Sequence, residues 1–388
     1  MDMLDELVAF VTLAAWLYLV AARGLFWLGA ERDNGPAPPP AAWPDVVAVV
    51  PARDEAACVA DSIGSLLRQD YPGSLAVILV DDDSADGTAE VARRAAAAAG
   101  SADRLNVIAG QPLAAGWTGK LWAMHQGVGA AERIEPRPGY LLLTDADIVY
   151  TRDAVRGLVA KAEAERLVLT SLMAKLRCES PAERALIPAF IFFFQMLYPF
   201  AWVNRPRSAT AAAAGGCMLV RSDALRQAGG IERIRVALID DCALARVLKA
   251  QGPIWLGLTE RVRSIRSYPH LDDIRRMVAR SAYAQLRYSP LLLAGTVAGM
   301  ALSYLAPPLL ALFGSGLSRW VGLAAWVLMA LALQPTLRFY RVSPLWGLCL
   351  PAIAFAYLLF TLDSAWASAR GRGGLWKGRV QASPTGPQ

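Results

Sequence analysis

Short apolar runs alternate with helix-like segments through the middle of the chain. The segments Ala57–Gln69 and the one that ends near Ala99 have the periodicity of amphipathic helices. Because strands that alternate with helices pair in parallel, the pattern predicts an α/β domain with a mainly parallel sheet at residues 45–287. Four strands are predicted. Two of them lie in Val46–Glu55 and Leu75–Thr88, ranges that include the polar loop after the strand, and the other two are Leu105–Ile108 and Leu141–Thr144.

Long uncharged runs at both ends of the sequence predict membrane helices. The first, residues 7–22, resumes after Arg23 and gives an N-terminal membrane helix at residues 1–30, with a helix lying in the interface as the alternative. Its acidic start differs from the basic start of a secretory signal peptide. A proline-rich linker at residues 31–44 follows. The uncharged runs Tyr288–Ser318, Trp320–Leu337 and Val342–Leu362 predict further membrane helices at residues 288–365. A basic tail follows at residues 366–388.

The uncharged run Ala185–Val203 is long enough to cross a bilayer, but we interpret it as a helix lying in the membrane interface. A single crossing there would separate Asp145 from Asp240, two acids that we assign to one site below. A buried core helix is the competing interpretation.

The basic residues at the two ends of the sequence predict membrane topologies that conflict with each other. Arg23 and Arg32 follow the first run, which favours an outside N-terminus and a cytoplasmic central domain. Four spans would then put the C-terminus outside, whereas the basic tail favours the cytoplasm. A re-entrant run or an interfacial first helix would remove the conflict, and both remain open.

Composition agrees with a membrane protein. Hydrophobic residues make up 55% of the 388 and charged residues only 19%. The net charge is +6, but the basic residues are scattered or lie beside apolar runs, which indicates membrane topology rather than nucleic-acid binding. The five cysteines lack the paired spacing of metal sites and suit a reducing cytosol.

Acidic residues end three of the predicted strands. The carboxyl ends of parallel strands meet at one edge of a sheet, where open α/β sheets bind their ligands. Asp145 and Asp147 lie two residues apart after an apolar run, so on an extended chain their side chains point the same way and can hold a divalent cation. For a D-x-D alone, a solvated turn is the commoner interpretation. The acids that end the other two strands are Asp54 with Glu55 and Asp81 to Asp83.

Two later segments add candidates. Ala209–Val220 is rich in alanine and glycine, so its backbone could approach a ligand closely, although tight packing would explain the composition equally well. Asp240 and Asp241 stand where an apolar run meets a predicted helix, a position at which acidic residues usually stabilise the helix start.

The motifs of the central domain resemble, in their order, those of the family 2 inverting glycosyltransferases with the GT-A fold. They are PARDE, VDDDSADGT, GWTGKLWA, TDAD and IDDCALA. Each is weak alone, but five in the right order form a specific signal. The segments LRCESPAERALIPAFIFFFQMLYPF, AAAAGGCMLVR and QLRYSPLLLAGTVAGMALSYL give a narrower resemblance, from about Val46 to Pro308, to the bacterial hopene-associated glycosyltransferases. The ceramide glucosyltransferases are more distantly similar.

The resemblance implies a nucleotide-sugar donor, taken here as a UDP-sugar. Pro51 to Glu55 and the pair Asp81–Asp82 correspond to the part that holds base and ribose, with Asp82 favoured for the uracil N–H. Lys120 would contact the diphosphate as a point charge. The Q/R-x-x-R-W signature of the polysaccharide synthases is missing, because no tryptophan follows Arg280. Arg280 faces either the diphosphate or, as a positive-inside residue, the membrane surface.

The resemblance also implies a metal and a base. Asp147 would ligate Mg²⁺ or Mn²⁺ directly, and Asp145 would face the ribose or the metal. Asp240 and Asp241 correspond to the acidic pair that supplies the general base, and the second acid, Asp241, is favoured. The cation and Lys120 would neutralise the leaving diphosphate while the base accepts the proton of the acceptor hydroxyl. One carboxylate without a second nucleophile implies inversion at the anomeric carbon.

The sequence therefore predicts a multi-pass glycosyltransferase of the bacterial inner membrane with a cytoplasmic catalytic domain. The resemblance implies a lipid acceptor, a hopanoid or another polyprenoid, and a single transfer rather than polymerisation. Two alternatives stay open. One is a non-catalytic scaffold that retains the fold beside lipid-modifying enzymes, and the other is a nucleotidyltransferase, in which Asp240 and Asp241 would have no role.

Overall fold

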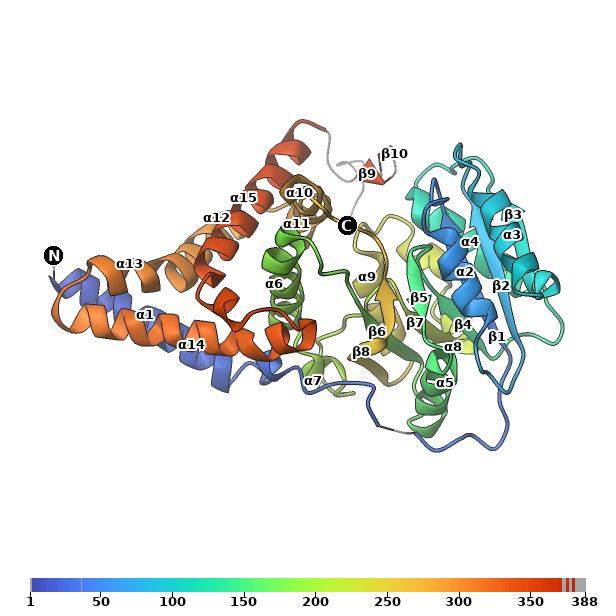
Figure 1. The fold of residues 1–388 in the computed structure, drawn as a ribbon, viewed down its shortest axis with the longest axis horizontal. Coiled ribbons are helices and arrows are strands. Elements are labelled where there is room, and N and C mark those ends of the chain that lie inside the picture. The colour runs from blue at the N-terminus through green and yellow to red at the C-terminus, as the bar shows by residue number, and fades with distance from the viewer. Residues whose placement is uncertain (1, 36, 372–374, 377–378, 381–388) are drawn as a thin grey trace. The chain divides into compact units, whose positions relative to one another are not determined.

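The computed structural model describes residues 2–35, 37–371, 375–376 and 379–380, which fall into two compact units. The sheet unit contains residues 31–177 and 202–267, together with a short hairpin of β9 (Leu375–Trp376) and β10 (Arg379–Val380). The helical unit contains residues 2–30, 178–201 and 268–371. Figure 1 shows the elements of both.

Within the described residues, the sheet unit is built on one sheet of eight strands in the order β3-β2-β1-β4-β7-β6-β8-β5 (Figure 1). The first four are mutually parallel, as are β6 and β8, but β7 runs antiparallel to β4 and β6, and β5 to β8. The predicted α/β fold is confirmed, and its sheet is mixed, with parallel pairs in the majority. The strands are β1 (Val46–Ala52), β2 (Leu75–Asp81), β3 (Leu105–Ala109), β4 (Tyr140–Leu143), β5 (Ile148–Tyr150), β6 (Leu169–Lys175), β7 (Met218–Arg221) and β8 (Ile254–Ser264).

Helices cover both faces of the sheet, because strands that are apolar on both sides must bury both. In β1, Val46, Ala48 and Val50 face a core shared with α2, α3 and α5. On the opposite face, Val49 packs against Gly127 of α4, where an added Cβ would overlap it. The helices of this part of the chain are α2 (Val59–Leu67), α3 (Thr88–Ala98), α4 (Gly119–Ala131), α5 (Ala154–Ala164), α7 (Phe200–Val203), α8 (Ser222–Gln227) and α9 (Asp240–Lys249).

The loops after β1 and β2 are joined to each other at the carboxyl edge of the sheet. Asp54 N donates to Ser84 Oγ at 3.0 Å, and Glu55 N donates to Thr88 Oγ1 at 2.9 Å. Pro51 is tolerated near the end of β1 because β4 stops opposite Val49, so no ladder bond to that neighbour is lost. The acidic strand ends are thereby held at one edge.

Five helices of the described chain are long and apolar enough to cross a membrane: Met3–Ala21, Pro181–Val203, Pro290–Phe313, Gly316–Tyr340 and Leu350–Ala369. The first, third, fourth and fifth overlap the runs predicted as membrane helices. The helices of the helical unit are α1 (Asp2–Ala21), α6 (Pro181–Leu197), α10 (Leu271–Ala279), α11 (Ala282–Gln285), α12 (Pro290–Met300), α13 (Ala306–Phe313), α14 (Gly316–Tyr340) and α15 (Leu350–Ala369).

A π-helical turn, Ala301–Leu305, joins α12 to α13 just before Pro307. Because Pro307 has no N–H, the carbonyl of Ser303 loses its usual helical donor. Trp16 of α1 replaces that donor, with Nε1 at 2.7 Å from the Ser303 oxygen, and Thr12 Oγ1 donates to Leu302 O at 3.1 Å. The side chains of α1 therefore satisfy the backbone where the proline interrupts the helix.

Candidate active site

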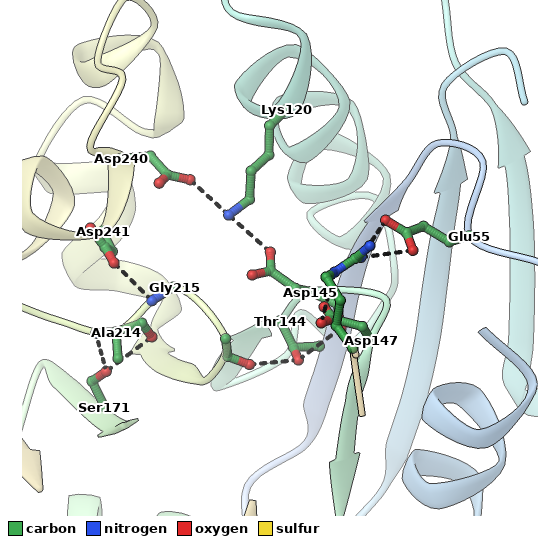
Figure 2. A network of polar contacts seen from close by, with 12 residues as sticks. Glu55, Lys120, Thr144, Asp145, Asp147, Ser171, Ala214, Gly215, Asp240 and Asp241 are labelled. Carbon is green, nitrogen blue, oxygen red and sulfur yellow. Dashed lines mark hydrogen bonds and ion pairs between the residues drawn. The ribbon is translucent and has the colours of Figure 1, made fainter. Parts of the chain in front are cut away.

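Lys120 lies between two carboxylates that come from distant parts of the sequence (Figure 2). Its Nζ is 2.8 Å from Asp145 Oδ1, just after β4, and 3.1 Å from Asp240 Oδ2, at the start of α9. Burial alone would lower the pKa of the Lys120 ammonium, but the two carboxylates outweigh burial and raise it. Lys120 is thus a fixed positive charge that ties both acids to α4.

Asp241 is held by backbone amides rather than by a cation. Gly215 N donates to its Oδ2 at 3.0 Å (Figure 2), and Cys242 N donates to its Oδ1 at 2.7 Å. Burial, together with the negative charge of Asp240, raises the pKa of Asp241 to about 6, against the lowering effect of Lys120 and the two amides. A carboxylate with this pKa can both accept and release a proton near neutral pH.

The loop around Gly215 passes close to both charged groups. A Cβ on Gly215 would lie 3.4 Å from Lys120 Nζ and 3.5 Å from Asp241 Oδ2. Two hydrogen bonds to the sheet hold the loop in place. Ala214 N donates to Ser171 Oγ at 2.9 Å, and Thr144 Oγ1 donates to the Gly216 carbonyl at 2.8 Å. The Ala209–Val220 segment was singled out by composition, and the structure brings its backbone to the acidic cluster.

Asp147 lies in a second ion-pair network. Its Oδ2 accepts from Ser264 Oγ at 2.7 Å and from Arg266 Nε at 3.2 Å. Arg266 Nη2 also binds both oxygens of Glu55, at 2.7 and 2.8 Å. Asp147 and Glu55 are each only 8% exposed, so this guanidinium neutralises two nearly buried acids. Sequence reasoning missed Ser264 and Arg266, because Arg266 is one of several arginines in a basic stretch.

The residues assigned to base and ribose lie at the ends of β1 and β2. Asp82 is 1% exposed, and its Oδ2 is 3.8 Å from Nη1 of Arg53, another residue that sequence reasoning missed. Asp81 is the last residue of β2 and accepts from Ser84 N at 3.1 Å, while Pro51 is buried within β1. The structure thus brings these residues to the edge that carries Glu55.

Arg280 belongs to the other unit. It follows the last residue of α10, and its backbone N–H donates to Arg276 O. Its assignment to the diphosphate stays a prediction.

The carboxylates suit a hard divalent cation, although they do not form a complete cage. Among the described residues, no group of three or more His, Cys, Asp and Glu side chains is arranged to hold a metal ion. Mg²⁺ is usually bound by only one or two carboxylates together with substrate phosphates, so Asp145 and Asp147 are enough for a cation that arrives with a diphosphate. Neither acid is a soft ligand, which agrees with Mg²⁺ or Mn²⁺.

Comparison with known families agrees with this arrangement. Residues 47–229 match the model of Glycosyl transferase family 2. This stretch of the chain is similar to the family 2 glycosyltransferases. The match begins in β1 and ends after α8, so it includes Lys120, Asp145 and Asp147, whereas Asp240 and Asp241 lie beyond it.

Solved structures are also similar to this chain. The mannosyltransferase PcManGT from Pyrobaculum calidifontis, in complex with GDP-Man and Mn²⁺, is 17% identical with a TM-score of 0.55, covering 95% of this chain and 99% of that one. Mannosyl-3-phosphoglycerate synthase from Rubrobacter xylanophilus is 20% identical with a TM-score of 0.37, covering 63% of this chain and 72% of its own. The first likeness shows a GT-A-like fold. Comparison with curated proteins found no match.

Proposed function

We propose that this protein is a membrane-bound, inverting glycosyltransferase that moves a sugar from a UDP-sugar to a lipid hydroxyl in hopanoid biosynthesis. The family 2 match supports a glycosyltransferase that uses a nucleotide sugar. The observation that carries the proposal is the cluster in which Lys120 binds Asp145 and Asp240 while Asp241 lies beside Gly215. The closeness of a lysine ammonium to a carboxylate with a raised pKa supports transfer with a general base.

Asp241 is the proposed general base. The two backbone N–H groups fix its carboxylate, and each oxygen keeps a lone pair that can accept the proton of an acceptor hydroxyl. Its pKa of about 6 leaves it mostly deprotonated at neutral pH while keeping it a better base than an exposed aspartate. Asp240 is tied to Lys120 and contributes negative charge that raises the pKa of Asp241.

Lys120, Asp145 and Asp147 form the proposed leaving-group side. The Lys120 ammonium would exchange part of its contact with the carboxylates for contact with the diphosphate, as a point charge on a flexible stem can. Asp145 and Asp147 would hold Mg²⁺ or Mn²⁺, which when bound offsets the charge that develops on the leaving diphosphate. The PcManGT structure, with GDP-Man and Mn²⁺ in a similar fold, supports a divalent cation and a nucleotide-sugar donor in general.

The five long apolar helices support a membrane location and hence a lipid acceptor. The hopanoid class rests on the resemblance of three sequence segments to the hopene-associated glycosyltransferases. The proposal places the sheet unit in the cytoplasm, where nucleotide sugars are made.

An in vitro assay tests the proposal. Membranes that contain the protein are incubated with radiolabelled UDP-sugars, Mg²⁺ and a hopanoid or polyprenol, and the lipid extract is counted. Label is expected in a new glycolipid. Absence of transfer with every sugar, by protein shown to be folded, would refute the activity. If Asp241→Asn and Asp147→Ala also left the lipid profile of the cells unchanged, a scaffold would be the better description.

A further inference from the structure

Two cations divide the acids of the TDAD motif between them. Lys120 binds Asp145, and Arg266 binds Asp147. Arg266 reaches further, because it also holds Glu55, which follows β1 (Figure 2). One guanidinium therefore joins two acids from different loops, both assigned to the donor half of the site.

The two acids need a positive charge whether or not the donor is bound. Each is 8% exposed, and nearly buried carboxylates without a counter-charge are strongly unfavourable. Arg266 Nε and Ser264 Oγ both bind Asp147 Oδ2, the group assigned to direct contact with the divalent cation. A guanidinium and a divalent cation at this carboxylate repel each other, so their binding is competitive.

Arg266 is placed so that it can withdraw. It lies beyond Ser264, the last residue of β8, and its side chain is 31% exposed. Ser264, by contrast, is part of the strand, and Ile265 N donates to the backbone oxygen of Asp147 at 3.0 Å. The backbone of the loop and the Ser264 hydroxyl can therefore keep Asp147 in position while the guanidinium moves away.

We propose that Arg266 is a positioning residue that substitutes for the divalent cation in the donor-free site and makes cation binding depend on the donor. The inference rests on the proposed function, since it assumes that Asp147 binds the cation of a nucleotide-sugar donor. A free cation must break the Arg266 ion pairs without compensation. A cation that arrives with a diphosphate gains phosphate ligands, and the released guanidinium stays near an anion. Donor and cation thus bind with positive coupling.

Binding of Mn²⁺ tests the proposal without any turnover. Purified full-length protein in detergent is titrated with Mn²⁺, and free Mn²⁺ is followed by electron paramagnetic resonance, with and without UDP. In Arg266→Met, Mn²⁺ should bind about tenfold or more tightly without UDP, because a positive charge next to the ligand is gone. UDP should then strengthen Mn²⁺ binding much less than in the wild type.

Two variants accompany this measurement. Arg261→Met is the matched control. Arg261 lies on β8, shortly before Arg266, but pairs with Asp33 and Asp153, so the Mn²⁺ affinity of this variant should equal that of the wild type. Arg266→Lys keeps a charge but cannot bind both acids with the planar fork, so a smaller rise in Mn²⁺ affinity is expected. If thermal unfolding shows that Arg266→Met does not fold, the Mn²⁺ affinity of Arg266→Lys is the measurement that tests the proposal.

Unchanged Mn²⁺ affinity and unchanged coupling in the folded Arg266 variants would overturn the inference. If the wild type still transferred sugar, the proposed function would stand. Failure of every protein to bind Mn²⁺ even with UDP would overturn both, since the site would then not hold a cation.

Discussion

Lys120 and the acids around it determine the charge of the site. Asp145, just after β4, and Asp240, at the start of α9, both bind this ammonium. Two carboxylates so close together repel each other unless a cation lies between them. The same group therefore stabilises the fold locally and, under the proposed function, would also supply positive charge for the diphosphate.

Replacing Lys120 with methionine should lower both stability and donor affinity. Because Asp145 keeps 34% of its side chain exposed, the expected loss of unfolding free energy is about 2 kcal/mol, below the usual range for fully buried pairs. Adding Asp240→Asn should restore part of the stability by removing one charge. Lys161→Met, which breaks a surface pair with Glu165, is the control and should change stability by about 1 kcal/mol or less. Thermal unfolding in detergent gives the stability of all four proteins. Equal stability of the wild type and Lys120→Met would contradict a stabilising role of the Lys120 charge.

The raised pKa of Asp241 predicts the pH dependence of transfer. The base acts only when deprotonated, so kcat/KM should rise about tenfold per pH unit below a pKa of about 6 and level off above it. Burial and the charge of Asp240 favour the protonated form of Asp241, so they shift this rise in kcat/KM to a higher pH than an ordinary aspartate would give. Initial rates between about pH 5 and pH 8, at saturating Mg²⁺, give the profile. A flat or falling profile would exclude Asp241 as the base.

Motifs in the sequence were enough to select the acids and Lys120, but their partners were not visible there. The TDAD and IDDCALA motifs are specific as members of an ordered set of five, whereas Arg266 and Ser264 lie in a stretch with many arginines and no recognisable motif. Gly215 was visible only as part of a small-residue segment. The positions of these three follow from the course of β8 and of the loop before β7, which depend on tertiary packing.

Helix α4 is the element that positions the site. Lys120 lies in its first turn, and two glycines lie further along, with different surroundings. Gly127 faces the sheet, where an added Cβ would overlap Val49 and approach Val80 to 3.0 Å. Gly129 faces open space, where the nearest atom to an added Cβ is Arg133 Nη1 at 3.9 Å. The close approach of α4 to β1 and β2 therefore depends on Gly127.

Alanine at these two glycines should change stability in opposite directions. Gly127→Ala forces α4 away from the sheet and should destabilise the protein by about 1–3 kcal/mol, with reduced transfer because Lys120 moves with the helix. Gly129→Ala should stabilise it by about 0.5–1 kcal/mol, since alanine favours a helix and meets nothing. Chemical denaturation followed by tryptophan fluorescence gives both values. Similar effects of the two changes would contradict the packing described for α4.

Element boundaries were predictable for β1 to β4, which pair in parallel at one end of the sheet, but not for β6 and β8, which are at least as long. β1 to β4 overlap the four runs predicted from the sequence, because buried strands with turn residues at their ends give a clear pattern. β5 and β7 have three and four residues, too few to show periodicity, and both form antiparallel pairs that connect distant segments. Their pairing, which makes the sheet mixed, is decided by long-range packing rather than by local pattern.

At the scale of the whole molecule, the site restricts the membrane topology. Asp145 and Asp240 share Lys120, so both lie on the same side of a bilayer. In the described chain between them, Pro181–Val203 is the one candidate span, and a single complete crossing by it is therefore excluded. This agrees with the interpretation of that run as an interfacial or core helix. The other four candidates remain available as full spans.

An extraction experiment checks the membrane assignment. Helices of 19 to 25 residues with mean hydropathy of 1.4 to 1.8 should hold the protein in the bilayer. Washing membranes with alkaline carbonate should therefore leave it in the pellet, whereas a mild detergent should release it. A known peripheral membrane protein serves as the control that carbonate removes. Release of this protein by carbonate would contradict membrane-spanning helices.

The most direct test of the central claim compares the wild type with Asp241→Asn in the radiolabelled transfer assay. Transfer should fall about 10²–10⁴-fold, because the base is lost, while UDP binding measured by calorimetry should stay close to that of the wild type. Asp103→Asn, at an exposed position outside the site, should keep full activity. Full transfer by a folded Asp241→Asn variant would show that the acidic cluster around Lys120 does not supply the base.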